Sequence, residues 1–152
     1  MLSDLIDERL VLLNAEASNW EDAVRVSMRP MVDANKITEG YIDAVISGIH
    51  ELGPYIVITE HVAFPHARPE CGALQTAVGM VTLKEPVEFG SEINDPVKFL
   101  FPLAATDSNS HIDALRSLVQ LLNDEDFFTQ LEQAQTPQEV IALVKAKEAA
   151  ME

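Results

Sequence analysis

The sequence has 152 residues, a length that suits one compact domain with a core of its own. Its hydrophobic fraction of 47% and charged fraction of 23% are ordinary for a globular protein and exclude fibrous and disordered classes. The formal net charge of −15 at pH 7 argues against a nucleic-acid binder, since no basic footprint meets the phosphates, and it suits docking on a basic partner or simple solubility equally well.

Cysteine usage and apolar runs bear on the cellular compartment. The single cysteine, Cys71, excludes an internal disulfide and favours a reducing environment. The apolar run over residues 10–13 is far too short for a signal sequence or a membrane span. We therefore expect a cytoplasmic protein without direct membrane insertion.

Hydrophobic periodicity and capping residues define the expected elements of the first 58 residues. Pro30 lies inside the first long helical pattern and predicts a kink or a break near Arg29. Gly53 and Pro54 end the second long helix. The expected elements are a short helix over 2–9, an edge strand over 10–13, a helix opened by the capping-box spacing 18–21, a helix capped by Thr38, and a strand over 55–58.

The second half alternates strands with helices. Pro102 interrupts a strongly apolar run and predicts a bulge or a strand end. The expected elements are strands over 75–83 and 97–105, turns at 84–87 and 94–96, a helix opened by His111 with the apolar face Ile112, Leu115, Leu118, Val119 and Leu122, a shorter helix after Asn123-Asp124, and a last helix from Thr136 to about Ala149. This order predicts an α/β sandwich with a mixed central β-sheet flanked by helices.

The stretch 59–72 is the most informative part of the chain. Pro65 fixes its own φ, so His66 is expected at a stiff junction between strand and loop, with Arg68 two residues further on. A neutral imidazole beside a fixed cation suits a nucleophile. The alternative is a buried edge strand followed by a turn, in which His66 is merely hydrogen-bonded. Glu70 and Cys71 fall in the same stretch, near predicted element ends.

His111 is the second candidate, because the N-terminus of a helix attracts anions and disfavours a protonated imidazole. With His66 as nucleophile and Arg68 as guanidinium, these residues suit a phosphoryl group. Its transfer asks the protein mainly for positioning and charge stabilisation. Asp107 and Ser108 precede His111 and are expected either to contribute donors there or simply to cap the helix.

The runs 56–58 and 62–70 together resemble the active-site segment of the enzyme IIA components of the bacterial phosphoenolpyruvate:sugar phosphotransferase system, in the mannitol/fructose class. Pro-His-Ala-Arg-Pro-Glu within them looks most like the ascorbate-type branch. The resemblance extends over nearly the whole chain and implies a single enzyme IIA domain over 1–152 with the mannitol-type fold. It implies that His66 is the phosphorylated histidine, that His111 lies beside it, and that no cofactor or resident metal takes part.

The resemblance also implies the partners. A histidine phosphocarrier protein would donate the phosphoryl group to His66, and a cysteine or histidine of a cognate enzyme IIB would accept it. The IIC membrane component would then use it to phosphorylate the incoming sugar, which this chain has no reason to encode. The docking faces of both partners would overlap around His66, and apolar residues such as Phe64 would be their natural centre.

One departure from the mannitol-type pattern concerns charge. Those members carry an arginine near the end of the helix before the site, where this chain has Ser47-Gly48-Ile49. We expect Arg68 to supply the missing charge and Glu70 to orient Arg68.

Three other readings remain open at this stage. A zinc site would use His61, His66, Cys71 and His111, although no CxxC or HExxH spacing is present. A hydrolase would use Cys71 as nucleophile, although no base is evident. A free-standing regulatory module would be phosphorylated on His66 and feed no transporter. Cys71, His50 and His61 are expected to be structural.

Overall fold

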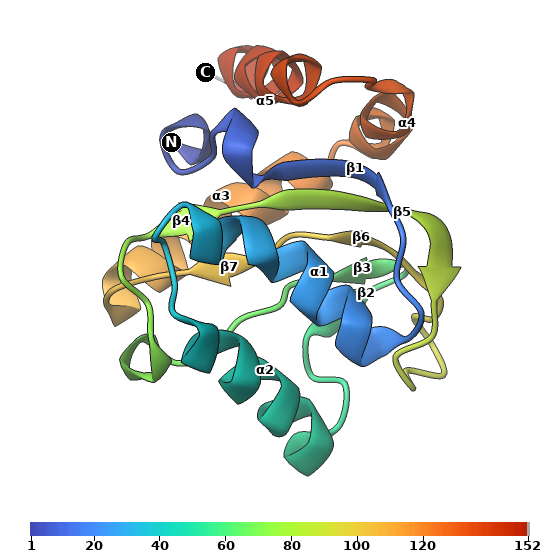
Figure 1. Cartoon of the computed structure of the whole chain (residues 1–152). Coiled ribbons are helices and arrows are strands. Elements are labelled where there is room, and N and C mark those ends of the chain that lie inside the picture. Colours follow the sequence, from blue (N-terminus) through green and yellow to red (C-terminus); the bar gives the residue numbers. More distant parts are fainter. Residues whose placement is uncertain (152) are drawn as a thin grey trace.

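The computed structural model describes residues 1–151, and a mixed β-sheet lies between two layers of helices (Figure 1). The five-stranded sheet has the order β1-β5-β6-β3-β2, in which β1 is parallel to β5, β3 is parallel to β6, and the other neighbours are antiparallel. β4 and β7 form a separate antiparallel pair. The predicted fold class is confirmed. The elements are β1 (Val11–Ala15), α1 (Trp20–Asp33), α2 (Glu39–Leu52), β2 (Val57–Thr59), β3 (Val62–Ala63), β4 (Ala77–Val78), β5 (Met80–Val87), β6 (Val97–Leu100), β7 (Leu103–Ala104), α3 (Ser108–Leu122), α4 (Glu125–Gln133) and α5 (Pro137–Met151).

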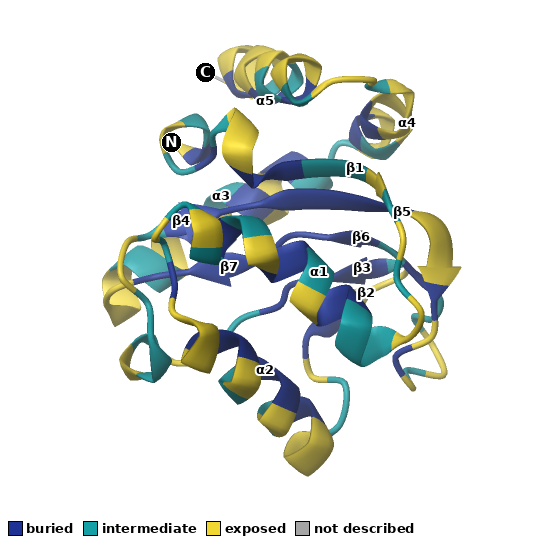
Figure 2. Cartoon of the chain, in the orientation of Figure 1, coloured by how far each residue is buried: buried dark blue, intermediate teal, exposed yellow. Residues whose placement is uncertain are grey.

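Side chains of the strands alternate between two apolar cores. Val62 and Phe64 belong to the core beneath α3, α4 and α5, whereas Ala63 belongs to the core beneath α1 and α2. Figure 2 shows the result, with the strands largely buried and the outer faces of the helices exposed. Both faces of the sheet are covered, which is why several strands form continuous apolar runs in the sequence.

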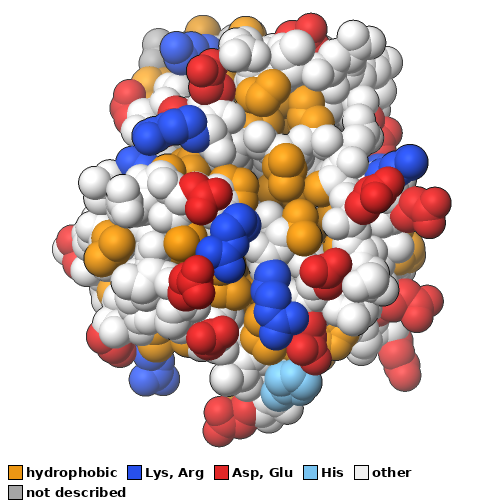
Figure 3. Space-filling view, in the orientation of Figure 1, with side chains coloured by type: hydrophobic (Ala, Val, Ile, Leu, Met, Phe, Trp, Pro, Cys, Tyr) orange, Lys and Arg blue, Asp and Glu red, His pale blue; other side chains and the backbone are white. Residues whose placement is uncertain are grey.

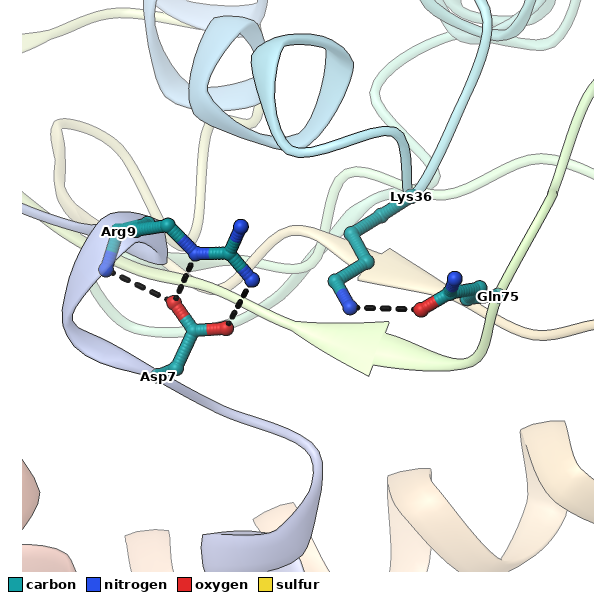
Figure 4. Close-up of polar contacts among 4 residues, drawn as sticks. All are labelled: Asp7, Arg9, Lys36 and Gln75. Carbon is teal, nitrogen blue, oxygen red and sulfur yellow. Dashed lines mark hydrogen bonds and ion pairs between the residues drawn. The ribbon is translucent and has the colours of Figure 1, made fainter.

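The N-terminal segment is not the single helix that the sequence predicted over 2–9. Two 3-10 helices, Leu2–Asp4 and Glu8–Leu10, replace it. Asp7 interrupts the segment because its carboxylate accepts the Arg9 N–H at 2.8 Å and restarts the chain as a cap (Figure 4). The Arg9 guanidinium binds the same carboxylate and lowers the pKa of Asp7.

The two ends of the described chain are joined by a buried carboxylate. Glu148 of α5 accepts the backbone N–H groups of Leu2 at 2.7 Å and Ser3 at 3.1 Å. These are N-terminal donors of the first 3-10 helix, which have no partner within their own helix.

A second contact between distant segments is the 2.7 Å hydrogen bond from Lys36 to Gln75 (Figure 4). No helix within residues 1–151 has the length and hydropathy needed to cross a bilayer.

Helix α1 differs from the prediction at its N-cap and near Pro30. Its N-cap is Asn19, whose side chain accepts the Asp22 N–H at 2.9 Å, and not Ser18. Of the kink or break predicted near Arg29, the break is wrong, because α1 continues through Pro30 to Asp33. Pro30 lies in the last turn, so its missing N–H costs a single hydrogen bond while later donors still pair.

Two predicted strands are divided by close contacts between distant segments. Gly79 separates β4 from β5, because its N–H donates to the Pro102 oxygen and an added Cβ would lie 3.0 Å from the Leu10 oxygen. Pro102 ends the pairing of β6, which confirms the predicted strand end. The turn predicted at 84–87 is wrong: β5 runs on to Val87, whose pairing with β6 resumes after a register shift.

Helix α3 begins earlier than predicted and packs through a different stripe. Asp107 is its N-cap, so His111 is the fourth helical residue rather than the first. Of the predicted face, Leu118 is buried but Ile112 is 50% exposed. Periodicity shows which residues share a face and does not show which of two neighbouring apolar stripes meets the sheet. The buried residues of α3 are Ala114, Leu118 and Leu121.

Candidate functional site

His66 lies three residues beyond β3, where the chain leaves the sheet. Backbone hydrogen bonds hold its approach on two sides: the Phe64 N–H donates to the Ile56 oxygen at 2.8 Å, and the Leu103 N–H donates to the Pro65 oxygen at 2.9 Å. Pro65 is buried and fixes the last φ before His66. The histidine is therefore carried on a rigid support, although it belongs to no strand or helix.

The hydrogen bond of the His66 ring determines its tautomer. Nδ1 lies 2.6 Å from the Phe64 carbonyl oxygen, and because a carbonyl only accepts, Nδ1 carries the proton. Nε2 then holds the lone pair. Burial lowers the pKa of His66, the Phe64 hydrogen bond opposes that shift, and the nearby His111 adds to it. The net result is a neutral imidazole near pH 7 with a free nitrogen.

His66 faces a cleft of about 480 Å³ between the ends of α2 and α3. Among residues 1–151, Arg68 is the only Lys or Arg side chain that lines this cleft, and no Asp or Glu lines it. That composition is unusual in a chain of net charge −15. The cleft is therefore suited to an anion although the protein as a whole is acidic. The other lining residues are Leu52, Tyr55, Ala67, Pro69, Ser108, His111 and Ile112.

The predicted second histidine lies beside the first. The ring centroids of His66 and His111 are 5.4 Å apart, with an angle of 47° between the planes. His111 is held in the first turn of α3 by its N–H bond to the Asp107 oxygen at 3.1 Å. Asp107 lies outside the cleft lining and acts as the cap, since its carboxylate accepts the Ser110 N–H at 2.7 Å. Ser108, by contrast, lines the cleft.

Arg68 also lies in the cleft, at the start of the 3-10 helix Pro69–Cys71. Its side chain is exposed and makes no ion pair or hydrogen bond within the described part of the chain. The expectation that Glu70 orients it is wrong, because the two side chains do not pair. Cys71 is half-buried and packs against the core beneath α1 and α2.

Two tyrosines that the sequence assigned only to a helix face and a strand also contact this segment. The Tyr41 hydroxyl accepts the Ala67 N–H at 3.0 Å and lies 2.9 Å from the Leu103 oxygen, to which it donates. Burial raises the pKa of Tyr41 to about 12, so it stays a donor. The Tyr55 hydroxyl donates to the His66 oxygen at 2.8 Å. The sequence feature that could have pointed to Tyr41 and Tyr55 is the hydroxyl group itself, since an apolar side chain would satisfy a helix face or a strand.

Other candidate residues lie elsewhere. Nδ1 of His61 is 2.7 Å from the Pro96 oxygen, and its Nε2 pairs with Glu60. No three His, Cys, Asp or Glu side chains within 1–151 come close enough to share a metal ion. Phe64 is 1% exposed, so the expectation that it forms the centre of a docking face is wrong.

Comparison with known proteins identifies the family. Residues 4–147 match the family model described as phosphoenolpyruvate-dependent sugar phosphotransferase system, EIIA 2. This chain belongs to that family. The ascorbate-specific PTS system EIIA component of Escherichia coli (strain K12) is 38% identical over 147 residues, which cover 96% of each chain.

Solved EIIA structures agree with the fold of this EIIA. The mannitol-specific cryptic phosphotransferase enzyme IIA CmtB from Escherichia coli has a TM-score of 0.85 and 36% identity, over 95% of this chain and 98% of that one. Enzyme IIAMTL from Escherichia coli, in its complex with phosphorylated enzyme IIBMTL, has a TM-score of 0.79 and 26% identity, over 93% of this chain and 97% of that one. The fold is therefore that of mannitol-type EIIA proteins.

The protonation of His66 in this EIIA is a measurable consequence of its burial. We expect its ring to titrate below 6.5, the ordinary histidine value, in a pH series followed by NMR. Between the folded pKa and 6.5 the unfolded chain binds a proton that the native ring does not, so His66 makes stability fall as pH falls through this window. The same ring in urea should titrate near 6.5. His111→Gln should leave the value below 6.5, because burial is the larger cause; a native midpoint at or above 6.5 would contradict the prediction.

Proposed function

We propose that this EIIA carries a phosphoryl group on Nε2 of His66, which it receives from the histidine phosphocarrier protein and passes to a cognate enzyme IIB. The observation that carries the proposal is the 2.6 Å hydrogen bond from Nδ1 to the Phe64 oxygen. It leaves Nε2 as the nitrogen with the lone pair, in a cleft that no carboxylate lines within the described residues. The ring is thus prepared as a nucleophile without an added base.

The proposed transfer step needs no cofactor, because one bond to phosphorus forms as another breaks. The Nε2 lone pair of His66 forms a bond to phosphorus while the bond between phosphorus and the carrier's histidine breaks, and that histidine recovers the electron pair. Positive charge develops on the His66 ring during attack. The Phe64 carbonyl stabilises that charge through the Nδ1 proton. Transfer to IIB is the same exchange, with the IIB nucleophile attacking and His66 as the leaving group.

The other cleft residues would stabilise the phosphoryl oxygens. Arg68 has no competing partner among the described residues and supplies a planar guanidinium that matches two oxygens at once. His111 and the N-terminal turn of α3 would supply further donors. Phosphoryl transfer depends mainly on such positioning and charge stabilisation.

The surroundings of the cleft support docking of protein partners. Leu52 is 74% exposed and Ile112 50% exposed, and both line the cleft together with His66. Apolar residues around a reactive group are typical of a protein interface. Acidic side chains are spread over the surface, and Figure 3 shows one face on which Lys and Arg side chains lie among them. The acidic side chains would steer a basic partner towards the protein.

We also propose that residues 1–152 form one cytoplasmic domain.

The acceptor we propose is the IIB of an ascorbate system. This proposal rests on the similarity to the ascorbate-specific EIIA component and on the complex of enzyme IIAMTL with phosphorylated IIBMTL. The sequence motif at 65–70 favours the same branch. A regulatory phosphohistidine module that feeds no transporter is the alternative, and no observation favours it.

The proposal is tested by intact-mass analysis after mixing the protein with phosphoenolpyruvate, enzyme I and the phosphocarrier protein. We expect one acid-labile phosphoryl adduct on the wild type, none on His66→Ala, and a normal adduct on His50→Ala, a surface-histidine control. Ascorbate-type and mannitol-type IIB proteins are then offered as acceptors, and the ascorbate-type IIB should discharge the adduct faster. An adduct that persists with every IIB would favour the regulatory alternative, and no adduct at all would remove the proposal.

A further inference from the structure

Tyr55 contacts both the main chain and the ring of His66. Its hydroxyl donates to the His66 carbonyl oxygen at 2.8 Å. Its ring stands edge-on to the imidazole, with centroids 5.5 Å apart and planes at 84°. Residues 64–68 belong to no strand or helix, so these side-chain contacts add to the backbone hydrogen bonds that Phe64 and Pro65 make.

The position of Tyr55 depends on a glycine in α2. An added Cβ at Gly48 would lie 3.2 Å from both Cε1 and Oη of Tyr55, closer than ordinary van der Waals contact. A methyl group there would therefore push on the hydroxyl that binds His66. Gly48 lies inside a helix, where glycine is unfavourable, and its φ is not positive. Backbone geometry therefore does not account for a glycine at this position, whereas the close packing of Tyr55 does.

We propose that Tyr55 is a positioning residue for the phosphoryl transfer at His66, and that Gly48 provides the space it needs; this inference rests on the function proposed above. The hydroxyl holds the His66 carbonyl, and the ring restricts the imidazole to the orientation in which Nδ1 meets the Phe64 oxygen. Nε2 then points to the incoming phosphorus. A small displacement of a reacting atom costs rate out of proportion to its cost in stability.

A positioning role and a purely structural role of Tyr55 predict different results for Tyr55→Phe. Tyr55 is 37% exposed, so its hydroxyl and the His66 oxygen would both find water if their hydrogen bond were lost, and thermal stability should change little. If Tyr55 positions His66, the variant should change the tautomer of the ring and the rate of transfer. If Tyr55 is only structural, both should stay as in the wild type.

The experiment compares Tyr55→Phe and Gly48→Ala with the control Gly40→Ala. Gly40 is another glycine of α2, and a Cβ there would meet only ordinary contacts, the nearest at 3.6 Å. With phosphoenolpyruvate, enzyme I and the phosphocarrier protein, we expect Tyr55→Phe and Gly48→Ala to phosphorylate about threefold to tenfold more slowly than wild type. Gly40→Ala should match wild type. Melting temperatures of all three show whether folding is retained.

Nitrogen-15 NMR of the unphosphorylated proteins provides the second readout. Wild type and Gly40→Ala should show the Nδ1-protonated tautomer of His66, and Tyr55→Phe and Gly48→Ala a mixture of tautomers. Wild-type rates in both site variants, or slowed transfer with an unchanged tautomer, would overturn the positioning role. If the wild type accepts no phosphoryl group, the proposed function fails, and the tautomer comparison still tests the effect of Tyr55 on His66.

Discussion

Arg68→Ala is expected to slow phosphorylation of His66 about tenfold to hundredfold, while the protein remains folded. Arg68 is the only Lys or Arg that lines the cleft within residues 1–151, and it has no partner there that already neutralises it. Its loss would therefore remove charge stabilisation from the transferring phosphoryl group and break no hydrogen bond or ion pair among residues 1–151. The expected value is below that for a fully buried donor, because Arg68 is exposed and water competes with it.

The measurement is a rapid-quench time course of phosphorylation, with Arg68→Lys and Arg116→Ala alongside. Arg68→Lys should recover part of the rate, because it retains the charge but not the planar fork. Arg116 is an exposed arginine of α3 that lies outside the cleft lining, so its removal should leave the rate unchanged. Equal rates for wild type and Arg68→Ala would show that Arg68 is only a surface residue.

Phe101→Ala is expected to lower the free energy of unfolding by about 3–5 kcal/mol. Phe101 is fully buried and packs edge-on against Phe64, with ring centroids 6.0 Å apart. Its removal leaves a cavity directly beside the residue whose carbonyl holds the His66 ring. We therefore expect slower phosphoryl transfer at temperatures where the variant is still folded.

Urea denaturation measures this loss, with Phe128→Ala as the comparison. Phe128 belongs to the edge of the same core, is half-buried, and packs against Phe99 and Phe127. Its truncation should cost less, about 1–3 kcal/mol, and should leave transfer unchanged because Phe128 does not line the cleft. A loss below about 2 kcal/mol for Phe101→Ala would mean that the core collapses around the cavity, contrary to this prediction.

Helix patterns in the sequence were informative where a local signal sets the end of a helix. The stop at Gly53 and the cap at Asp124 both lie where the sequence predicted them. Strand ends were less predictable, since they depend on partners far along the chain. Gly79 ends one strand and begins another because it passes close to the Leu10 oxygen, a contact that no local pattern contains.

Some features of the candidate site could also be predicted from the sequence, whereas others depended on contacts between distant segments. The sandwich class followed from the hydrophobic period of the elements, and the family from the resemblance of the motif around Pro65-His66. The stiff junction predicted at His66 followed from Pro65, because a proline acts on its immediate neighbours. Only the tertiary structure showed that Phe64 lies beneath the surface, that Glu70 does not pair with Arg68, and that Tyr55 holds His66.

The meeting of His66 with His111 also depends on pairing over long range. The Leu103 N–H binds the Pro65 oxygen, and α3 starts four residues after β7 ends, so the two histidines reach one cleft from segments far apart in sequence. The sequence by itself determined that this EIIA has His66, Arg68 and His111, the side chains we propose for binding a phosphoryl group. Tertiary structure decided which of them share a cleft, because that depends on strand pairing and packing between distant segments.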